Sequence, residues 1–429
     1  TLGVAFGPPA EGQPQAPRVQ QVLPGQTAES LGLKAGDRIV EAGGKPTATV
    51  PDVIAFVGTL RAGVPVELVV ERDGQTLRLS GKAIGRPRET YVGAQVRYGE
   101  MAFRGGRVAD ILVTPNGVKD PPVVYYIQGF NCGSIESSDP EGLYRRLTSA
   151  LVEAGIAVYR VEKPGVGDST GGVSCTQIDY ATELDSFRTA YRRLTGELGF
   201  PAQRVFMLGH SLGGLEAPML ADERAPRGVA VYGTVVRNWA DYHHDIDAFQ
   251  AFVMAGVDPV AEQQRAEGGR EVVRRFYFER QSPRQIVAAR PELEPYVRGL
   301  LDWDGGDNAM GRHFKYLQDM ASLPLVQAWR DARTNVLALY GASDMVALND
   351  EDHRMIADVA NFYRPGSGTF IEVADTGHGM DLIGPRDAVR RQALAGGPAE
   401  PPKFNPKVAE ALIGWIKACL AKPPIAAVS

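Results

Sequence analysis

The chain has 429 residues, of which 44% are hydrophobic and 23% charged, and its net charge at pH 7 is -5. This length favours two or three domains with sizeable cores. The weakly acidic balance offers no basic surface for nucleic acid, and no apolar run is long enough for a membrane span. The sequence begins at Thr1 rather than at methionine, so we expect that a preceding segment, such as a secretory signal, was removed.

The first 86 residues have the pattern of a small, mostly β domain. Alternating hydrophobic residues, turn residues and short apolar runs predict strands at 19–23 and 37–41, helices at 28–31 and 51–60, and a hairpin of 66–71 with 75–80 around Asp73-Gly74.

Two stretches of this segment, GLKAGDRI at 32–39 and VVERDG at 69–74, resemble a PDZ domain of the bacterial protease type. The resemblance implies that a peptide C-terminus docks on backbone N–H groups of a loop and extends the sheet as an added strand. Thr1-Leu2-Gly3-Val4 occupies the place of that loop, and 4–6 is the strand to be extended. The expected peptide-binding residues are therefore Leu2, Gly3, Val4 and Phe6. The alternative is that the PDZ fold serves only as a spacer or docking surface.

Residues 86–89 read as a linker, after which strand and helix patterns alternate to the C-terminus. This alternation is typical of a mostly parallel sheet with helices on both faces. We expect leading antiparallel strands at 92–96, 101–103 and 108–114, inner strands at 123–127, 157–161, 204–208, 228–232, 336–340 and 369–373, and a closing helix at 408–420.

Residues 209–213 read Gly-His-Ser-Leu-Gly and fit the pattern G-x-S-x-G. An apolar strand precedes the motif and a helix-compatible run, 214–221, follows it, although Pro218 could kink that helix. The helix start would supply N–H donors and a positive dipole end behind Ser211. The sequence therefore predicts a serine nucleophile on a tight turn between strand and helix.

From about residue 90 onward, the chain resembles the α/β-hydrolase superfamily, in which a serine, an acid and a histidine follow one another. Asp344 lies in the loop YGASD after a buried strand, and His378 lies in the loop DTGHGM after the last strand. The resemblance implies that Ser211, Asp344 and His378 form a catalytic triad. Asp375 is interpreted as a loop residue, and His210 as a packing or orienting residue.

The strand 123–127 leads into Gln128-Gly129-Phe130-Asn131, which resembles the oxyanion loop of this superfamily with glutamine in place of histidine. The expected oxyanion donors are the backbone N–H groups of Phe130 and Leu212. The turn at 162–169, EKPGVGDS, is given a purely structural role.

Between about 239 and 333 the chain is charged and helical in character, without a strand pattern. In an α/β hydrolase such an insertion would be a helical cap over the active site. The alternative is a helical subdomain unrelated to the substrate. The expected domains are thus a PDZ-like domain at 1–86 and an α/β-hydrolase domain at 90–429.

Three cysteines are present, and their spacing fits no zinc or redox motif. In the α/β-hydrolase fold, the loops that carry Cys132 and Cys175 emerge at the catalytic edge of the sheet, so we hypothesise a disulfide between them. The alternative is two buried thiols. A disulfide would argue for an oxidising compartment, periplasmic or secreted, rather than the cytoplasm. Cys419, in the closing helix, is expected in the core.

The leading functional interpretation is an esterase-like serine hydrolase that acts on a small-molecule acyl substrate and has a PDZ domain for a peptide or protein C-terminus. One alternative is a serine peptidase that uses the PDZ domain to select protein C-termini. Another is an inert scaffold built on the same folds. No metal or organic cofactor is expected.

Overall fold

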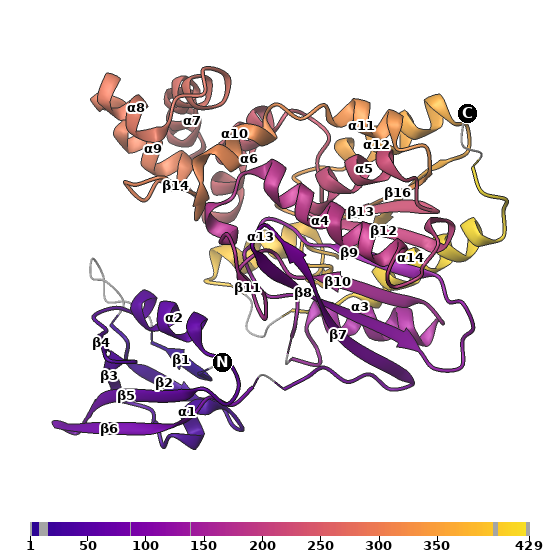
Figure 1. Cartoon of the computed structure of the whole chain (residues 1–429). Coiled ribbons are helices and arrows are strands. Elements are labelled where there is room, and N and C mark those ends of the chain that lie inside the picture. The colour runs from indigo at the N-terminus through magenta and orange to yellow at the C-terminus, as the bar shows by residue number, and fades with distance from the viewer. Residues whose placement is uncertain (1, 8–15, 86, 138, 398–401, 426–429) are drawn as a thin grey trace. The chain divides into compact units, whose positions relative to one another are not determined.

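The computed structural model describes residues 2–7, 16–85, 87–137, 139–397 and 402–425, with the side chains of 251–255 left aside. The chain divides into two compact units, residues 1–89 and 90–429 (Figure 1). Each unit has its own hydrophobic core. The predicted architecture, a mostly β unit followed by an α/β sheet with a helical insertion, is confirmed.

The N-terminal unit contains two small antiparallel sheets and two helices. The strands and helices are β1 (Val4–Phe6), β2 (Val19–Val22), α1 (Thr27–Ser30), β3 (Arg38–Ala42), β4 (Lys45–Pro46), α2 (Val50–Thr59), β5 (Pro65–Arg72) and β6 (Gln75–Lys82). The larger sheet has the order β4-β3-β5-β6, and β1 pairs with β2. The predicted hairpin turns at Asp73 and Gly74, whose φ angles of 50° and 77° suit a tight turn between twisted strands.

The second unit is built on a nine-stranded mixed sheet of order β11-β8-β10-β9-β12-β13-β16-β17, with β7 paired to β8. Its strands are β7 (Ala94–Phe103), β8 (Gly106–Pro115), β9 (Val123–Ile127), β10 (Ala157–Val161), β11 (Thr170–Gly171), β12 (Val205–His210), β13 (Gly228–Tyr232), β16 (Asn335–Gly341) and β17 (Gly368–Val373). From β10 to β17 the neighbouring strands are parallel. Every residue of β9, β10 and β13 is buried, as expected for parallel strands covered on both faces.

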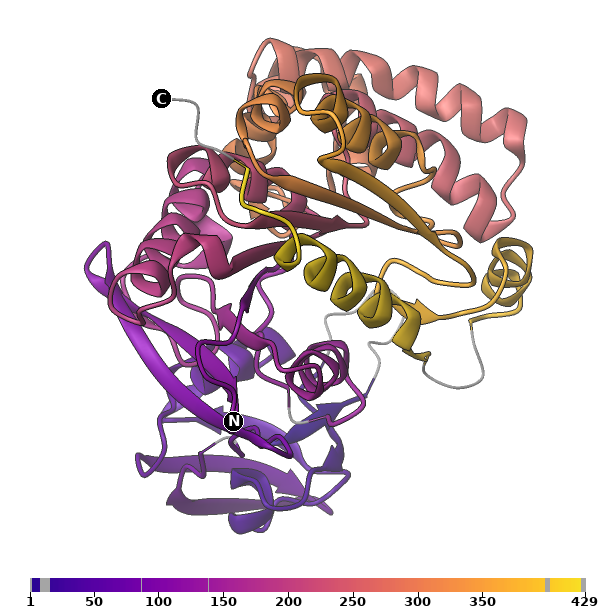
Figure 2. The same ribbon diagram turned by 90° about the vertical axis from the view of Figure 1, so that its right-hand side faces the viewer.

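Helices cover both faces of this sheet. The covering helices are α3 (Leu143–Glu153), α4 (Tyr180–Thr195), α5 (Gly213–Glu223), α11 (Leu325–Asp331), α12 (Glu351–Tyr363) and α14 (Pro406–Leu420). Tyr125 of β9 packs into the core with α4 and α5, whereas its neighbour Tyr126 packs with α3 and α14. Figure 2 shows α14 lying along its face of the sheet. This alternation is the two-residue period of a strand.

The leading strands differ from the prediction. Residues 94–103 form one continuous strand rather than two short ones, and they pair with β8 along their whole length. Gly99 lies in the middle, where a Cβ atom would come within 2.6 Å of an Asp110 carboxylate oxygen. The hydrophobic pattern did not predict this strand as one element, because a glycine and charged residues interrupt the pattern at a solvent-facing edge of the sheet.

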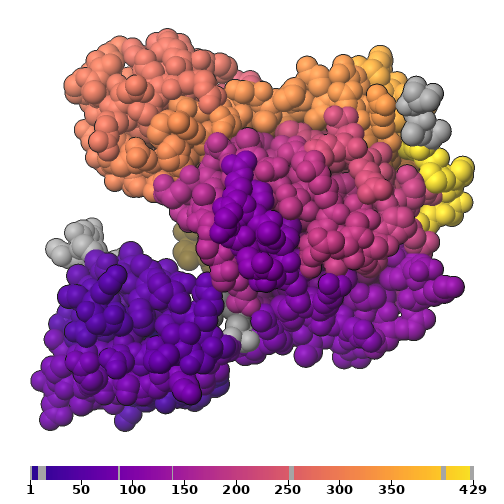
Figure 3. All heavy atoms as spheres, in the orientation of Figure 1, coloured from indigo at the N-terminus to yellow at the C-terminus, as the bar shows by residue number. Residues whose placement is uncertain are grey.

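The insertion between β13 and β16 is mainly helical and forms a lobe on the second unit (Figure 3). Its elements are α6 (Trp239–Ala255), α7 (Pro259–Val273), the π-helix η3 (Arg274–Phe278), α8 (Pro283–Ala289), η4 (Pro291–Leu293), α9 (Glu294–Leu301), β14 (Asn308–Ala309), β15 (Arg312–His313) and α10 (Phe314–Met320). The expectation that it holds no strand was wrong, because β14 and β15 pair as a small hairpin. Strands of two residues are too short to show an alternating pattern.

The remaining short elements follow the sheet. They are the 3₁₀ turns η1 (Cys175–Gln177) and η2 (Ala202–Arg204), helix α13 (Arg386–Leu394), and the strands β18 (Asp381–Leu382) and β19 (Lys403–Phe404). β18 pairs with β19, so the chain segment after His378 is tied to the start of α14. Among the helices of the described residues, none is long and apolar enough to cross a membrane.

Candidate active site

Ser211 occupies a sharp turn between β12 and α5. Its φ angle of 55° is unusual for a residue with a side chain, and its N–H donates to the Tyr232 carbonyl oxygen at 2.9 Å. A Cβ atom on Gly209 would lie 2.3 Å from the Gly213 oxygen, and one on Gly213 would lie 2.1 Å from the Ile127 oxygen. The two glycines of the motif are therefore required by close backbone packing, and the turn exposes Ser211 at the carboxyl edge of the sheet.

Three side chains from three strand ends form one hydrogen-bonded line. Nε2 of His378 lies 3.0 Å from Oγ of Ser211, and Nδ1 of His378 lies 2.9 Å from Oδ2 of Asp344. Asp344 follows β16, and His378 follows β17. The structure thus brings together the three residues that the sequence singled out, although Ser211 and His378 are 167 positions apart.

The acid of this line is fully buried. Oδ1 of Asp344 accepts hydrogen bonds from the N–H groups of Val346 at 2.7 Å and Ala347 at 2.8 Å. Burial alone would raise the pKa of Asp344, but His378 and these two N–H groups outweigh it and lower that pKa. Burial would likewise lower the pKa of His378, yet the charge of Asp344 and its hydrogen bond raise it. The pair therefore favours an ionised carboxylate beside a basic imidazole.

His210 contacts the backbone of the loop that carries His378. One ring nitrogen, Nε2, lies 2.8 Å from the backbone oxygen of His378, and Nδ1 lies 2.9 Å from the Tyr126 hydroxyl. Burial, followed by the proximity of His378, lowers the pKa of His210 to about 4. A neutral ring can donate from Nε2 to the carbonyl and accept from Tyr126 at Nδ1, and these contacts fit the packing or orienting role expected of His210.

The loop after β9 packs directly against the serine. A Cβ atom on Gly129 would lie 2.8 Å from the Ser211 Cβ. Within the described residues, the N–H groups of Phe130 and Leu212 donate to no protein acceptor. Leu212 immediately precedes α5 and so carries one of the unpaired N–H groups of a helix start. Gln128, which stands where the superfamily has histidine, donates from Nε2 to the Val161 oxygen at 3.2 Å.

A family model described as "Alpha/beta hydrolase family" matches residues 129–392, more than half of the chain. The chain belongs to the α/β hydrolase family. A model of the PDZ domain matches residues 1–82. The family match of this α/β hydrolase includes residues 129–131 of the loop after β9, the serine motif, the insertion and the loop that carries His378.

Individual relatives match over shorter stretches or with low identity. Metalloprotease MmpA of Caulobacter vibrioides is 33% identical over 107 residues, 24% of this chain and 26% of its own length. Periplasmic serine endoprotease DegP of Escherichia coli is 39% identical over 62 residues, 14% of this chain and 13% of its own. The chain thus spans about a quarter or less of the length of these curated relatives.

Among solved structures, Est1E from Butyrivibrio proteoclasticus with ferulic acid bound has a TM-score of 0.48 at 16% identity, covering 76% of this chain and 100% of its own. A soluble variant of monoglyceride lipase from Saccharomyces cerevisiae has a TM-score of 0.47 at 13% identity, covering 78% and 99%.

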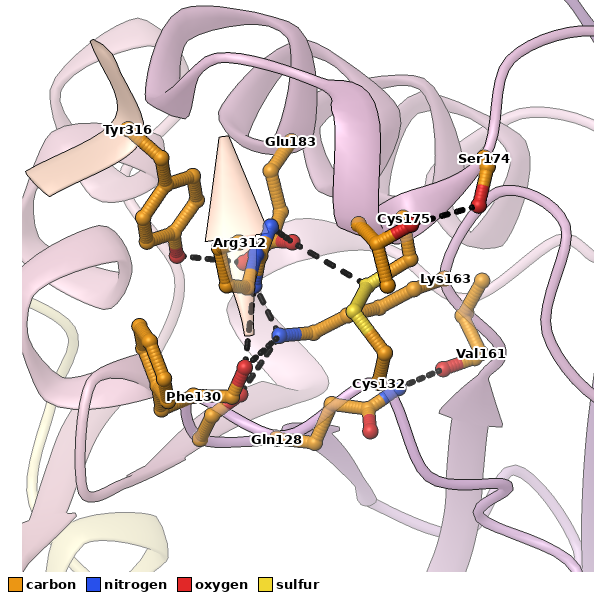
Figure 4. Close-up of a disulfide and its surroundings, with 12 residues drawn as sticks. Gln128, Phe130, Cys132, Val161, Lys163, Ser174, Cys175, Glu183, Arg312 and Tyr316 are labelled. Atoms are coloured by element: carbon orange, nitrogen blue, oxygen red, sulfur yellow. Dashed lines mark hydrogen bonds and ion pairs between the residues drawn. A yellow bond between two sulfur atoms is a disulfide. The ribbon is translucent and has the colours of Figure 1, made fainter. Parts of the chain in front are cut away.

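A buried ionic cluster contacts the loop after β9 that was predicted to hold the oxyanion (Figure 4). Lys163 forms an ion pair with Glu183 at 2.9 Å, and Arg312 forms one with the same carboxylate at 2.6 Å. The Tyr316 hydroxyl also donates to Glu183, at 2.7 Å. From the sequence, the turn that contains Lys163 was expected to be purely structural, and no role was predicted for Glu183, Arg312 or Tyr316. The available signal was the charged pair Glu162-Lys163 directly after a predicted inner strand.

Cys132 and Cys175 form a disulfide with a Cα–Cα distance of 5.8 Å, and Cys419 is buried and free. The bond links the end of the oxyanion loop to the turn before α4 (Figure 4). In the described residues, no three His, Cys, Asp or Glu side chains gather as a metal ion would require.

Removing this disulfide should lower the stability of the chain. Loop-closure entropy for a sequence separation of 43 residues corresponds to about 4 kcal/mol of unfolding free energy. We expect the double variant Cys132→Ser/Cys175→Ser to unfold at lower urea concentration than the parent chain. Cys419→Ser is the control, because it removes a buried thiol without opening a covalent loop. Equal midpoints for the parent and the double variant under oxidising conditions would contradict this expectation.

The expected peptide-binding residues lie at one edge of the PDZ unit. Thr1 lies outside the described residues. Leu2 is 2% exposed and belongs to the core, so only its backbone remains for a ligand. Gly3 has a φ of 81°, and a Cβ there would lie 2.4 Å from the Gln26 Cβ, which explains the glycine. Among the described strands, β1 pairs only with β2.

A cavity of about 440 Å³ lies next to the histidine loop. Its lining consists of Asp139, Glu141, Gly142, Leu143, Gly379, Asp381, Pro402, Lys403 and Phe404. Gly379 directly follows His378, so this cavity borders the loop that carries the candidate base. Its volume is within the range of small-molecule sites.

Proposed function

We propose that the chain is a serine hydrolase that cleaves an ester or related acyl bond through an acyl-enzyme on Ser211. The observation that carries this proposal is the unbroken line from the Ser211 hydroxyl through His378 to the buried Asp344. A serine hydroxyl is a weak nucleophile at neutral pH and needs a base within hydrogen-bond reach.

In the proposed mechanism, His378 takes the proton of Ser211 as Oγ attacks the acyl carbon. Asp344 holds the imidazole with Nε2 toward the serine and stabilises the imidazolium. The N–H groups of Phe130 and Leu212 receive the negative oxygen of the tetrahedral intermediate. His378 then gives its proton to the leaving group, and a water molecule hydrolyses the acyl-enzyme by the same steps in reverse order.

The esterase hypothesis is preferred because the part of the chain after residue 90 has a helical insertion and no peptidase-specific motif. A peptidase is the second candidate, since the PDZ domain and the short stretches similar to periplasmic DegP proteases favour a protein substrate. We propose that the insertion is a cap that limits which acyl groups reach Ser211.

Matched short-acyl p-nitrophenyl esters and p-nitroanilides separate these candidates, with Ser211→Ala as the blank. Ester hydrolysis that depends on Ser211, with little anilide cleavage, would support the esterase. Anilide cleavage at a comparable rate would favour the peptidase. Absence of Ser211-dependent turnover of either class, together with no labelling of Ser211 by a fluorophosphonate, would favour the inert scaffold.

We further propose that the PDZ unit binds a peptide C-terminus along β1. The support is the positive φ of Gly3, which turns the loop backbone, and the edge of β1 that pairs with no other described strand. Fluorescence polarisation with one peptide series, made with free and with amidated C-termini, tests this proposal. Tighter binding of the free carboxylate is expected, and equal binding of both forms would contradict it.

We propose a periplasmic or secreted location. The disulfide between Cys132 and Cys175 favours an oxidising compartment. Cell fractionation of the native host, with alkylation of free thiols before lysis, tests it. Recovery of the protein in the cytoplasm with both cysteines alkylated would contradict the proposal.

Activity should rise with pH through the pKa of His378. His378 acts as a base only when neutral, and Asp344 raises its pKa above 6.5, so activity is lost as pH falls through that raised value. The profile of kcat/KM against pH for p-nitrophenyl butyrate should therefore have one acidic limb with its midpoint above 6.5. A midpoint near 4 would point to His210 instead, whose pKa is about 4.

A further inference from the structure

The ionic cluster behind the oxyanion loop is withdrawn from solvent. The side chains of Lys163, Glu183 and Arg312 are 0%, 1% and 2% exposed. Buried charges of this kind are costly unless each is paired and hydrogen-bonded, and buried ion pairs add little to stability compared with apolar packing. The position of these charged side chains next to the loop after β9 suggests that they have a function other than stabilising the fold.

The cluster binds the backbone of the loop itself. Nζ of Lys163 donates to the Gly129 oxygen at 2.5 Å and lies 3.4 Å from the Phe130 oxygen. Nη1 of Arg312 donates to the same Phe130 oxygen at 2.9 Å (Figure 4). Two cations from distant parts of the sequence therefore hold two successive carbonyl groups of the loop.

The Gly129 carbonyl and the Phe130 N–H belong to the same peptide group. In a planar trans peptide these two bonds point in opposite directions. Holding the carbonyl toward Lys163 therefore turns the N–H away from the cluster. Gly129 also packs against Ser211, because a Cβ atom on Gly129 would lie 2.8 Å from the Ser211 Cβ and 3.3 Å from its Oγ.

Burial and neighbouring charges set the ionisation of the cluster. Glu183 is one carboxylate shared by Lys163 and Arg312. Burial and then the charge of Glu183 raise the pKa of the neighbouring Glu216 well above its usual range, which favours the neutral acid. Burial lowers the pKa of Lys163, and Glu183 opposes that shift. The two basic groups that donate to the loop carbonyls thus share Glu183 as the carboxylate paired with both.

We propose that Lys163 is a positioning residue of the oxyanion hole: it fixes and polarises the Gly129–Phe130 peptide so that the Phe130 N–H meets the developing oxyanion. A carbonyl that accepts from a cation makes the N–H of its own peptide a stronger donor. This inference rests on the proposed function as a serine hydrolase. It adds Lys163 as the residue that orients the Phe130 N–H, one of the two proposed oxyanion donors. Arg312 supports the same loop from the insertion.

The test compares Lys163→Met with Lys163→Gln. Methionine removes the donor and the charge, whereas glutamine keeps an N–H donor without the charge. In both variants Glu183 keeps its bonds to Arg312 and Tyr316. Arg193→Met is the control, because Arg193 forms another largely buried ion pair, with Asp110 at 2.8 Å, and does not contact the loop.

Four quantities are measured for each chain: kcat and KM for p-nitrophenyl butyrate, the rate of Ser211 labelling by a fluorophosphonate, and the midpoint of thermal unfolding. For Lys163→Met we expect kcat and the labelling rate to fall roughly 10- to 100-fold, less than for deletion of an oxyanion donor. KM should change by no more than about twofold, since ground-state binding is untouched. Lys163→Gln should lose less, and Arg193→Met should lose stability but not kcat.

A Lys163→Met chain with the parent kcat and labelling rate would overturn the proposal, as would an equal loss of kcat in Arg193→Met. If Lys163→Met does not fold, Lys163→Met/Glu183→Gln, which removes the opposing charge as well, replaces it with the same expectation. Failure of the parent chain to label at Ser211 would instead refute the serine hydrolase, so the two failures are distinguishable.

Discussion

Replacing Ser211 by alanine should lower kcat for p-nitrophenyl butyrate by roughly 10⁶-fold, to the level left by binding and the oxyanion donors alone. The hydroxyl is placed to attack, because its oxygen lies 3.0 Å from Nε2 of His378. The fold should survive, since the N–H of residue 211 still donates to Tyr232 and alanine is smaller than serine.

Ser367→Ala is the matched control. Ser367 is a buried serine that donates to the Ala360 oxygen at 3.1 Å, and it precedes β17, at the strand end opposite the site. Its loss should cost about 1 kcal/mol of stability and leave kcat unchanged. A Ser211→Ala chain that retains a tenth of the parent rate, measured on protein free of contaminating esterase, would rule out the proposed nucleophile.

Replacing Asp344 by asparagine should lower kcat roughly 10⁴-fold while the fold is kept. The N–H groups of Val346 and Ala347 bind Oδ1, so the asparagine oxygen must take that place and its amide must face His378. The amide then donates to Nδ1, and the ring proton moves to Nε2. An imidazole protonated at Nε2 cannot accept the proton of Ser211.

Asp375→Asn is the control for this variant. Asp375 is a second acid close to His378 in the sequence, three positions before it. Asparagine tolerates the φ angle of 58° at this position. We expect its kcat to stay within about threefold of the parent, because it holds neither His378 nor Ser211. A loss in Asp375→Asn equal to that in Asp344→Asn would reassign the acid.

Much of the hydrolase sheet could be predicted because its inner strands are short, largely apolar runs. The motif around Ser211 also has a steric signature, since Gly209 and Gly213 leave no room for a Cβ. Residues that follow strand ends meet at one edge in a parallel sheet, and this general rule accounts for the proximity of Ser211, Asp344 and His378.

The ionic cluster could not be predicted in the same way. Arg312 lies 129 positions from Glu183, and its surroundings are charged like any solvated helix face. Partners that come from a strand end, a covering helix and the insertion share no periodic pattern. The hairpin that carries Arg312 was missed for a related reason, because its strands contain two residues each.

The contact between Arg312 and the Phe130 carbonyl limits how the insertion can change in evolution or in the laboratory. A lobe attached only by its two chain ends could be exchanged between relatives as an independent module. Here an exchange that discards the β14–β15 hairpin also removes a support of the loop at residues 129–130. Chimaeras designed to alter substrate range should therefore graft only α7 to α9 and keep residues 308–316 from this chain.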